Sequence, residues 1–542
     1  MPLQPISGIL LAAALGISGT TANGQTAESL RNRPELSLPF VEGKPVVAHF
    51  MTDLIFHRGT GQGDINSPEM YRRDGASKEI GGMIQHFPMV AKLHPDMSLE
   101  ECAGFEMRAA KRLGIDGFQF YFPLTGNKAY MERSVTIIQA FFRVAEKEFP
   151  GFKLTLCLCN PRDVGNEEEM IQAWGGYIRK ILEHSKDSGN WLRTPDGRYI
   201  FFEWIGDALA DRVPKHWQVK DDPKLIGDVA VAYEKLAGNI GIPMAMVYHL
   251  RWPKDRAHVE AVLDYFPAIW GWTDSYRPDD GWEQVANSCK KRKRTYTQTI
   301  YPDYYTSKLY RRANPKEMLF RYKDAKALGV ENLERQYQIC HLSYLFRKLL
   351  ERAIKVDAPM VNLVTWNDYP EGHHLAPEIN HNFGFALLLH HYKSVWKGQV
   401  QETPESAVVF FKKYRHDVVP KPFAINIRTK ASVGEESGDD GIEIVTLLKE
   451  PGSLFVNGDC IGKVGAGLQA HKIPSRPGKV HVQVKRGELT VIDFTTPEAI
   501  TKKPYRTDRL TYSYSSEFGR FFTDLFGDAE PFTSNEYSGA KD

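Results

Sequence analysis

The segment LVTWNDYPEGHHLAPEINHNFGF (residues 363–385) concentrates side chains that can do chemistry. Hydrolysis of a glycosidic bond typically needs two carboxyl groups, one that protonates the leaving oxygen and one that acts as base or nucleophile. Asp368 and Glu371 can supply this pair, because three residues of spacing across a turn let both side chains reach one cavity. Trp366 and Asn367 beside them suit stacking on a sugar ring and hydrogen bonding to a hydroxyl.

The segment also fits a plain polar turn. In that interpretation Asp368 begins the turn, Pro370 and Gly372 complete it, and Glu371 is solvated. This interpretation would be preferred for an isolated Asp-x-x-Glu. The neighbouring Trp, Asn and two His residues, together with the apolar strand before them, favour the catalytic interpretation.

A metal site is the third interpretation, because five side chains are potential ligands: Glu371, His373, His374, Glu378 and His381. The helical His-Glu-x-x-His spacing is absent, however, and a proline at position 377 interrupts any helix that would align the last two His residues. Hydrogen-bonded side chains in a site wall explain each His more simply. We therefore expect no metal and no cofactor. A metal-dependent hydrolase stays an alternative that stoichiometric zinc or calcium would favour.

Eight runs of β-branched and aromatic residues alternate with helical patterns between residues 44 and 396. One helix is marked by a capping box of Ser98 and Glu101, another by apolar spacing. Near-continuously apolar strands separated by helices are typical of a parallel sheet covered on both faces, and eight such units close into a (β/α)8 barrel of TIM type. An open doubly wound sheet is the competitor, but no Gly-rich loop follows the first strand. The expected strands are residues 45–51, 114–122, 152–159, 198–205, 242–250, 265–272, 294–301 and 359–366.

Polar and aromatic residues follow the expected strands, where a barrel of this kind places its active site. The chain has ten Trp and 24 Tyr residues, and flat rings can hold sugar faces. We expect about half of the strand-end residues to face the site, because Asp and Asn also serve as helix N-caps. The predicted substrate-binding residues are His49, Tyr121, Trp204, His249, Trp272, Asp274, Tyr301, Trp366, Asn367 and His373.

The pattern changes after residue 400. Short alternating runs broken by Gly, Pro and Asp, with no helical stretch between them, predict an antiparallel β-sandwich domain. The last forty residues are too aromatic for a free tail and should pack back on a domain. The predicted organisation is a signal peptide at 1–24, a catalytic (β/α)8 barrel at 40–400, a β-sandwich at 401–500 and an aromatic-rich C-terminal extension at 501–542.

The N-terminal leader has an apolar run over residues 9–17, followed by small residues at 20, 22 and 24. This fits a secretory signal peptide cut near residues 22–24, so we expect a secreted or periplasmic protein. The run is too short to span a bilayer, and no later stretch could do so.

The composition describes a globular protein of at least two domains. At 542 residues the chain is too long for one core, and its 42% hydrophobic content is ordinary. Sixty-nine basic and 67 acidic residues leave a net charge of +2, too balanced to indicate a nucleic-acid partner. The six cysteines form no dense framework, and Cys157 and Cys159 are poorly placed for a mutual bridge, so buried free thiols are expected.

The eighth strand resembles glycoside hydrolase family 71, the α-1,3-glucanases or mutanases. VTWNDYPEGHH (residues 364–374) is similar to the family signature Trp-Asn-Asp-Tyr-Gly-Glu-Ser-His-Tyr, and VVAHFM and GIDGFQF are similar to its first two strands. The resemblance covers about residues 44–500. It implies Glu371 as general acid, Asp368 as the base that activates water, and inversion at the anomeric carbon.

Two features depart from that family pattern. Residues 370, 372 and 374 are Pro, Gly and His where the family typically has Gly, Ser and Tyr, and the segment 302–358 is long, with extra helix. Both changes affect the rim of the site, so the resemblance implies the reaction more firmly than the substrate.

A more distant likeness is to the family 99 endo-α-mannosidases and endomannanases, whose Trp-Asn-Glu-Trp-His-Glu-Gly loop implies retention. The sequence therefore predicts a glycoside hydrolase that cleaves α-glucan, with a polysaccharide or oligosaccharide as its partner. An endo-α-mannosidase-like hydrolase and a non-catalytic carbohydrate-binding barrel are the alternatives, because a fold does not dictate its function.

Overall fold

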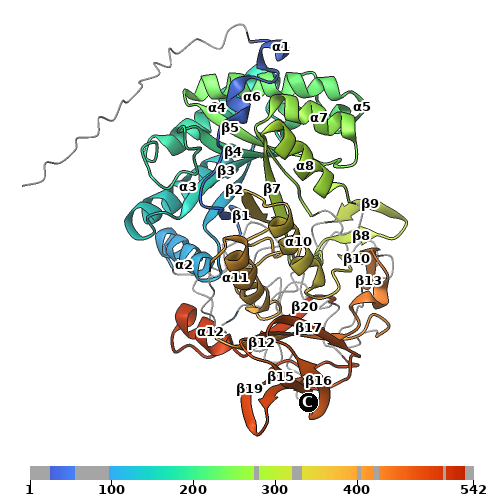
Figure 1. The fold of residues 1–542 in the computed structure, drawn as a ribbon. Helices are drawn as coiled ribbons and strands as arrows, with labels where there is room; N and C mark the ends of the chain where they lie inside the picture. Colours follow the sequence, from blue (N-terminus) through green and yellow to red (C-terminus); the bar gives the residue numbers. More distant parts are fainter. Residues whose placement is uncertain are drawn as a thin grey trace, which may run out of the picture.

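The computed structural model describes residues 25–54, 89, 97–273, 280–319, 333–399, 404–418, 427–503 and 508–531. Its centre is a closed barrel of eight parallel strands, in the order β1-β11-β7-β6-β5-β4-β3-β2 (Figure 1). The ring closes where β1 pairs with β11 on one side and β2 on the other. This confirms the predicted barrel. Its strands are β1 (Val46–Phe50), β2 (Gly117–Pro123), β3 (Lys153–Cys159), β4 (Tyr199–Trp204), β5 (Met244–His249), β6 (Ala268–Trp270), β7 (Thr295–Ile300) and β11 (Met360–Leu363).

A long helix follows each barrel strand and covers the outside of the ring. The capping box predicted for the first of them is present: the Ser98 hydroxyl accepts from the Glu101 backbone N–H at 3.2 Å, and the Glu101 carboxylate accepts from the Ser98 N–H at 2.7 Å. None of the described helices is long and apolar enough to cross a bilayer. The helices of the ring are α2 (Leu99–Arg112), α3 (Lys128–Glu148), α4 (Glu167–Leu182), α6 (Ile226–Ile240), α7 (Arg256–Tyr265), α8 (Trp282–Arg292), α10 (Tyr344–Lys355) and α11 (Gly384–Trp396).

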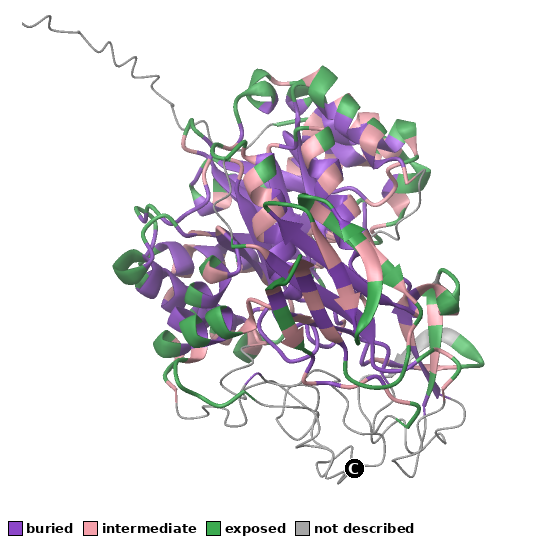
Figure 2. Ribbon diagram, turned by 60° about the horizontal axis from the view of Figure 1, so that its bottom comes forward, coloured by how far each residue is buried: buried purple, intermediate pink, exposed green. Residues whose placement is uncertain are grey.

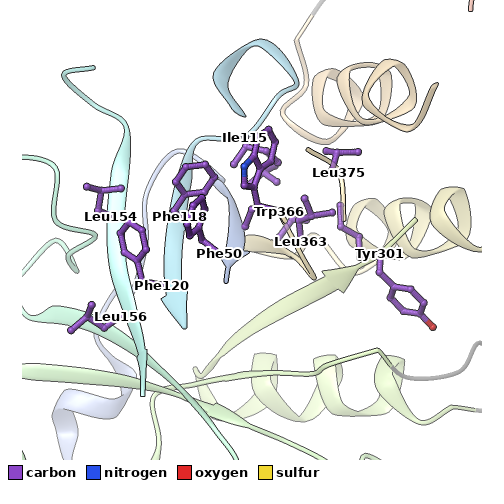
Figure 3. Packing of buried hydrophobic residues seen from close by; sticks show 14 of the residues in the cluster. Phe50, Ile115, Phe118, Phe120, Leu154, Leu156, Tyr301, Leu363, Trp366 and Leu375 are labelled. Atoms are coloured by element: carbon purple, nitrogen blue, oxygen red, sulfur yellow. The ribbon is translucent and has the colours of Figure 1, made fainter. Parts of the chain in front are cut away.

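The barrel strands are buried on both faces, because successive side chains point alternately inward and toward the helices (Figure 2). Val47, Phe202 and Val247 belong to a cluster inside the ring. Phe50 and Phe118 belong to the larger cluster between the ring and its helices (Figure 3). The face of a strand on which a residue falls therefore decides whether it can line the barrel interior.

The segment between β7 and β11 carries a feature that the sequence did not reveal. Extra helix was expected over residues 302–358, and α10 is present. The same segment also supplies three strands, β8 (Leu309–Arg311), β9 (Asn314–Leu319) and β10 (Leu333–Gln338), of a separate sheet in the order β13-β10-β8-β9. Its fourth strand, β13 (Arg428–Val433), comes from the region expected to form the sandwich, and it pairs in parallel with β10.

The remaining C-terminal strands form two antiparallel four-stranded sheets below the barrel in Figure 1, as expected of a sandwich. Strand β20 comes from the aromatic C-terminal segment and pairs with β12, and α12 (Phe518–Phe526) follows it. The first sheet contains β17 (Gly467–Ile473), β14 (Ile442–Leu448), β12 (Ser406–Lys412) and β20 (Thr511–Ser515), and the second β16 (Asp459–Val464), β15 (Gly452–Val456), β18 (His481–Arg486) and β19 (Leu489–Thr495).

A buried charged cluster joins the sandwich to the barrel. The Lys412 ammonium on β12 lies 3.5 Å from an Asp303 oxygen in the loop after β7 and 3.3 Å from an Asp439 oxygen. It also donates to the Arg509 carbonyl at 2.7 Å, and the Thr511 backbone N–H donates to Asp303 at 2.7 Å. All three charged side chains are at most 2% exposed, so the loop after β7 is held against the second domain.

All six cysteines are free thiols, and five of them are buried as expected. Cys460 is exposed, which corrects the expectation of burial for this residue. The sulfur atoms of Cys157 and Cys159 lie 3.5 Å apart on the inward face of β3, where the Cys159 thiol donates to Cys157 and no disulfide is formed.

Candidate active site

A belt of aromatic and imidazole rings lines the carboxyl ends of the barrel strands. Trp272, which follows β6, is its centre: its ring centroid lies 4.9 Å from that of His49 on β1 and 5.2 Å from that of Trp204 on β4. Tyr121 on β2 contacts Trp204 at 6.3 Å, and His249 on β5 stacks on the same indole. Tyr121, Trp204 and Trp272 are partly exposed. The structure thus brings together side chains from five strands.

The candidate catalytic pair lies on the loop after β11, next to this belt. The Asp368 backbone N–H donates to the Thr365 hydroxyl at 2.8 Å, and an Asp368 carboxylate oxygen accepts from the Glu371 backbone N–H at 3.1 Å. One oxygen of each carboxyl group and one ring nitrogen of His373 lie within 4.8 Å of one another. His373 also meets Trp272, with ring centroids 5.9 Å apart. The pair and the aromatic belt therefore form one continuous site.

Asp368 does take the turn-forming role that the simpler interpretation assigns to it. Glu371, however, is not a solvated turn residue, because its side chain is only 18% exposed and Asp368 is 6% exposed. Two acidic side chains are thus buried side by side, which costs free energy unless nearby groups stabilise them. A turn needs no such arrangement.

Two cationic or hydrogen-bonding groups hold Glu371. The Lys308 ammonium, from the segment before β8, forms an ion pair with its Oε1. The His373 Nε2 lies 3.0 Å from its Oε2, and the Tyr304 ring stacks on His373 with centroids 5.9 Å apart. Asp368 forms no ion pair with any described Lys or Arg residue.

These surroundings move the pKa values of the two carboxyl groups in opposite directions. Burial and the neighbouring Glu371 charge raise the pKa of Asp368 to about 6. Burial alone would also raise the pKa of Glu371, but Lys308 and His373 outweigh it and lower this pKa to about 2. Between these values one carboxyl group carries a proton and the other is ionised, as an acid/base pair requires.

The segment that carries Lys308 forms backbone hydrogen bonds with the loop after β11, which carries Asp368 and Glu371 and is called the catalytic loop below. The Tyr305 backbone N–H donates to the Glu371 carbonyl at 3.1 Å, and the Ser307 N–H donates to the Pro370 carbonyl at 2.6 Å. Gly372 has φ +71°, and a Cβ atom there would lie 2.7 Å from the Tyr305 carbonyl oxygen. This close approach requires glycine. The position of Lys308 is therefore set by backbone contacts.

Of the ten predicted substrate-binding residues, the structure brings six into this ring network: His49, Tyr121, Trp204, His249, Trp272 and His373. Asp274 lies outside the described residues. The other three, Tyr301, Trp366 and Asn367, have different roles.

Trp366 is a core residue, which corrects the expectation of a sugar-stacking ring. Its indole is fully buried in the layer between barrel and helices, 5.5 Å from the Phe118 ring, and its Nε1–H donates to Glu106 on α2 at 2.6 Å (Figure 3). Its backbone N–H donates to the His49 carbonyl, so the chain still runs along β1 at this point. The side chain therefore falls on the outer face.

Asn367 is a structural residue as well. Its Oδ1 accepts from the Met51 backbone N–H at 2.7 Å, and its Nδ2 donates to the Met51 and Leu54 carbonyls at 3.1 and 2.5 Å. The amide thus satisfies backbone groups just after β1. This corrects its expected role as a ligand for a sugar hydroxyl.

Tyr301 is also corrected. Its ring is 1% exposed in the same outer core and points away from Trp366, and its hydroxyl donates to Gln338 on β10 at 3.4 Å (Figure 3). Tyr301 therefore links the end of β7 to the separate sheet that contains β10.

Sequence reasoning missed Lys308 as a site residue, and no local signal could have found it. It lies in an insertion without a recognisable motif, 63 residues before its partner. Only the contacts between the two loops bring it to Glu371.

Glu203 at the end of β4 is a structural residue. Glu203 is buried, and its two oxygens accept from the Gly206 and His249 backbone N–H groups at 2.7 and 2.6 Å. Burial and the nearby Asp207 raise its pKa to about 8. It therefore joins the carboxyl ends of β4 and β5.

The loop after the catalytic pair contains the residues that could best hold a cation. One ligand atom each of His374, Glu378 and His381 lies within 4.8 Å of the others, and all three side chains are buried. The group is also hydrogen bonded internally: Glu378 accepts from the Asn380 and His381 backbone N–H groups, and His381 Nδ1 lies 3.1 Å from the His374 carbonyl. These bonds stabilise a buried loop.

The sequence model of glycosyl hydrolase family 71 matches residues 339–515. The chain is a glycoside hydrolase. The match contains β11, the loop with Asp368 and Glu371, and the sandwich strands. It confirms the resemblance to family 71 over the C-terminal part of the predicted range, whereas residues 44–338 lie outside the match. No curated protein matches the chain.

Several solved structures are similar to this glycoside hydrolase. A family 99 endo-α-mannosidase from Bacteroides thetaiotaomicron is 12% identical, with a TM-score of 0.42, and the match covers 66% of this chain and 99% of that one. A protein described as glycoside hydrolase-like is 11% identical, with a TM-score of 0.41 and coverage of 70% and 100%. A β-glucuronidase from Bacteroides uniformis is 11% identical, with a TM-score of 0.40 and coverage of 77% and 45%.

Proposed function

We propose that this glycoside hydrolase cleaves α-1,3-glucosidic bonds in α-glucan, with Asp368 and Glu371 as its catalytic carboxyl groups. One observation carries the proposal. The two groups lie within 4.8 Å of each other at the carboxyl end of β11, and His373 connects them to an aromatic belt from five other strands. Acidic pairs and flat rings are what a glycosidase needs for acid/base chemistry and for holding sugar faces.

The choice of α-1,3-glucan rests on the family resemblance alone. The aromatic belt supports a polysaccharide or oligosaccharide substrate, because Tyr121, Trp204 and Trp272 present partly exposed ring faces in a row. No contact in the belt distinguishes glucose from mannose, so α-mannans belong in the same assay.

The assay is the release of reducing ends from a panel of α-glucans and α-mannans. We expect release from α-1,3-glucan by the wild type and at least about a hundredfold lower rates in both Asp368→Asn and Glu371→Gln, the usual scale for an acid/base group. Circular dichroism would check that both variants keep the fold. Near-normal turnover in either variant would refute the catalytic pair.

The main rival is a non-catalytic carbohydrate-binding barrel. It would bind glycan equally well in the wild type and in both variants, and none of the three proteins would release reducing ends. Chelator treatment belongs in the same experiment. Loss of activity on chelation, together with stoichiometric zinc or calcium, would favour a metal-dependent hydrolase.

The separation of the carboxyl groups also bears on stereochemistry. Retaining glycosidases place the two groups about 5 to 5.5 Å apart, whereas inverting enzymes leave about 6.5 to 9.5 Å for a water molecule. The resemblance to family 71 implies inversion, and the more distant likeness to family 99 implies retention. NMR of the first-formed product would show the α-anomer for retention and the β-anomer for inversion.

Export is a further part of the proposal, and it rests on the leader sequence of residues 1–24, which lies outside the described residues. N-terminal sequencing of the protein recovered from medium or periplasm should find a start near residues 23–25. An uncut chain retained in the cytoplasm would refute export.

A further inference from the structure

A second group of ionisable side chains follows the catalytic pair along the same loop. One ligand atom each of His374, Glu378 and His381 lies within 4.8 Å of the other two. Oε1 of Glu378 lies 3.6 Å from Nε2 of His374 and 3.6 Å from Nδ1 of His381, and all three side chains are at most 1% exposed. Ligand atoms on one metal ion are about 3 to 4 Å apart, because each lies about 2 Å from the ion. The loop thus gathers a possible ligand set without the helix that such spacing usually needs.

The surroundings of His381 call for a cation. Its Nδ1 lies 3.1 Å from the His374 carbonyl oxygen, and its Nε2 lies 3.5 Å from Oδ2 of Asp303. A neutral imidazole has one N–H group, so whichever nitrogen carries it, the other nitrogen presents a lone pair to oxygen atoms. A metal ion between them, or a second proton on the ring, removes this repulsion.

The buried charges around this group point the same way. Lys412 lies 3.5 Å from Asp303 and 3.3 Å from Asp439, whereas Glu378 faces the two His side chains. Three buried carboxylates against one ammonium leave two negative charges, which are costly in the interior unless they are compensated. One divalent ion compensates them while both imidazoles stay neutral, as metal ligands must be.

We propose that His374, Glu378 and His381 bind one divalent metal ion of the zinc class, which holds the catalytic loop against the sandwich. Imidazole nitrogens favour zinc and its transition-metal neighbours, whereas calcium and magnesium favour sites built from oxygen atoms. A His ligand usually donates its other N–H to a carboxylate or a backbone carbonyl, and His381 has one of each. The inference does not depend on the proposed cleavage of glycan.

The place of this group in the fold indicates a structural role for the ion. The Ser513 backbone N–H on β20 donates to the Asn380 carbonyl at 2.7 Å, and the Ser513 hydroxyl donates to the His381 carbonyl. The ligands therefore lie where the loop meets the sandwich. Catalytic zinc sites keep a position open to the substrate, but no ligand here is more than 1% exposed, so a polysaccharide does not reach the ion.

Two further groups of His and acidic side chains fit a metal ion less well. The catalytic pair with His373 already has a cation, because the Lys308 ammonium contacts Glu371. The third group contains Asp417, whose side chain is 55% exposed, and Asp440, which pairs with the guanidinium of buried Arg509.

The metal content of the full-length protein is the first test. The wild type, purified without chelator, should contain or take up about one zinc ion per chain. A protein that takes up no zinc would overturn the proposal, and a second proton on the His381 ring would then be its compensating charge.

Two substitutions test the ligands. His374→Tyr introduces the residue that the family 71 signature typically has at this position, and His381→Gln removes the second imidazole. We expect each variant to bind zinc at least about a hundredfold more weakly than the wild type, measured by competition with a chromophoric chelator. Circular dichroism would check that both variants keep the fold.

His416→Gln is the matched control, because it removes a His side chain from the third group and leaves the proposed ligands in place. It should bind zinc as tightly as the wild type. Unchanged affinity in both ligand variants, or an equal loss in the control, would overturn the assignment.

Cobalt(II) tests the ligand type without any substitution. Cobalt held by two imidazoles and a carboxylate should give the visible absorption of a four-coordinate ion, and zinc should displace it. A spectrum typical of cobalt with six oxygen ligands would overturn the proposal.

Removal of the ion tests its structural role. Dialysis of the wild type against a chelator should lower Tm by at least about 5 °C, because an ion that binds only the folded chain stabilises it. Added zinc should restore Tm, and added calcium should not. An unchanged Tm after removal of the metal would overturn the structural role. No measurement here uses a glycan, so a chain that hydrolyses no glycan would refute the proposed function and leave the metal site testable.

Discussion

Two tryptophans at barrel strand ends, Trp272 after β6 and Trp366 after β11, show why residue type alone does not assign function. Trp272 lies at the end of β6 with a partly exposed ring, in contact with His49, Trp204 and His373. Trp366 lies on the catalytic loop in sequence, yet its ring is fully buried and its Nε1–H is bonded to Glu106. The first can meet a sugar, whereas the second can only stabilise the scaffold.

Substitution of these two tryptophans should therefore have opposite effects. Trp272→Ala removes ring area that would face the substrate, so we expect KM to rise by at least about tenfold, with little change in the free energy of unfolding. Trp366→Phe keeps most of the packing but removes the donor to buried Glu106, so we expect a loss of about 1 to 3 kcal/mol in stability with KM unchanged. Steady-state kinetics and urea unfolding measure both. A rise in KM for Trp366→Phe would indicate that the Trp366 ring contacts the substrate.

At the scale of elements, two irregular segments build the candidate active site. The strands and helices of the barrel supply the frame, but the catalytic loop after β11 and the segment before β8 hold each other through backbone hydrogen bonds. Gly372 is the closest point between them, since any Cβ there would meet the Tyr305 backbone.

Gly372→Ala should therefore separate the two segments and move Lys308 away from Glu371. We expect a loss of about a hundredfold in kcat/KM, the scale associated with a displacement of about 1 Å in an active site, and reduced stability. Gly151→Ala is the matched control: this glycine also has a positive φ, +91°, but nothing lies within 4 Å of the added Cβ. It should cost about 1 to 2 kcal/mol without loss of activity. Equal activities in the two variants would contradict the role of this contact.

At the scale of the whole molecule, the sandwich contacts the loops that surround the candidate site. Lys412 on β12 lies between Asp303 of the barrel and Asp439, and the Ser513 backbone N–H on β20 donates to the Asn380 carbonyl of the loop after β11. The loop that carries Asp368 and Glu371 thus continues into a segment that rests on the second domain.

Lys412→Met should leave two buried carboxylates without their shared cation. We expect a loss of about 3 to 5 kcal/mol in the free energy of unfolding, because removing one partner of a buried pair leaves an uncompensated charge. Urea denaturation would measure it, with Lys355→Met as the exposed control, expected to cost at most about 1 kcal/mol. If Lys412→Met cost no more than the control, the domains would not be joined by this cluster.

The sequence by itself determined the barrel architecture and proposed the location of the candidate site. Eight apolar runs separated by helical patterns predict the barrel, because a strand buried on both faces must be apolar at nearly every position. The strand-end rule then places six of the ring residues together, and the Asp-x-x-Glu motif with its family resemblance identifies the catalytic pair as the candidate.

Only the tertiary structure decided which strand-end residues meet and which carboxyl group has a counterion. Trp366, Asn367 and Tyr301 turn toward the core or the backbone, because the face on which a side chain falls depends on how far the strand pairing continues. Lys308 reaches Glu371 through the contact of two loops 63 residues apart. Electrostatic surroundings depend on such distances in space, and a pattern of residue types along the chain does not contain them.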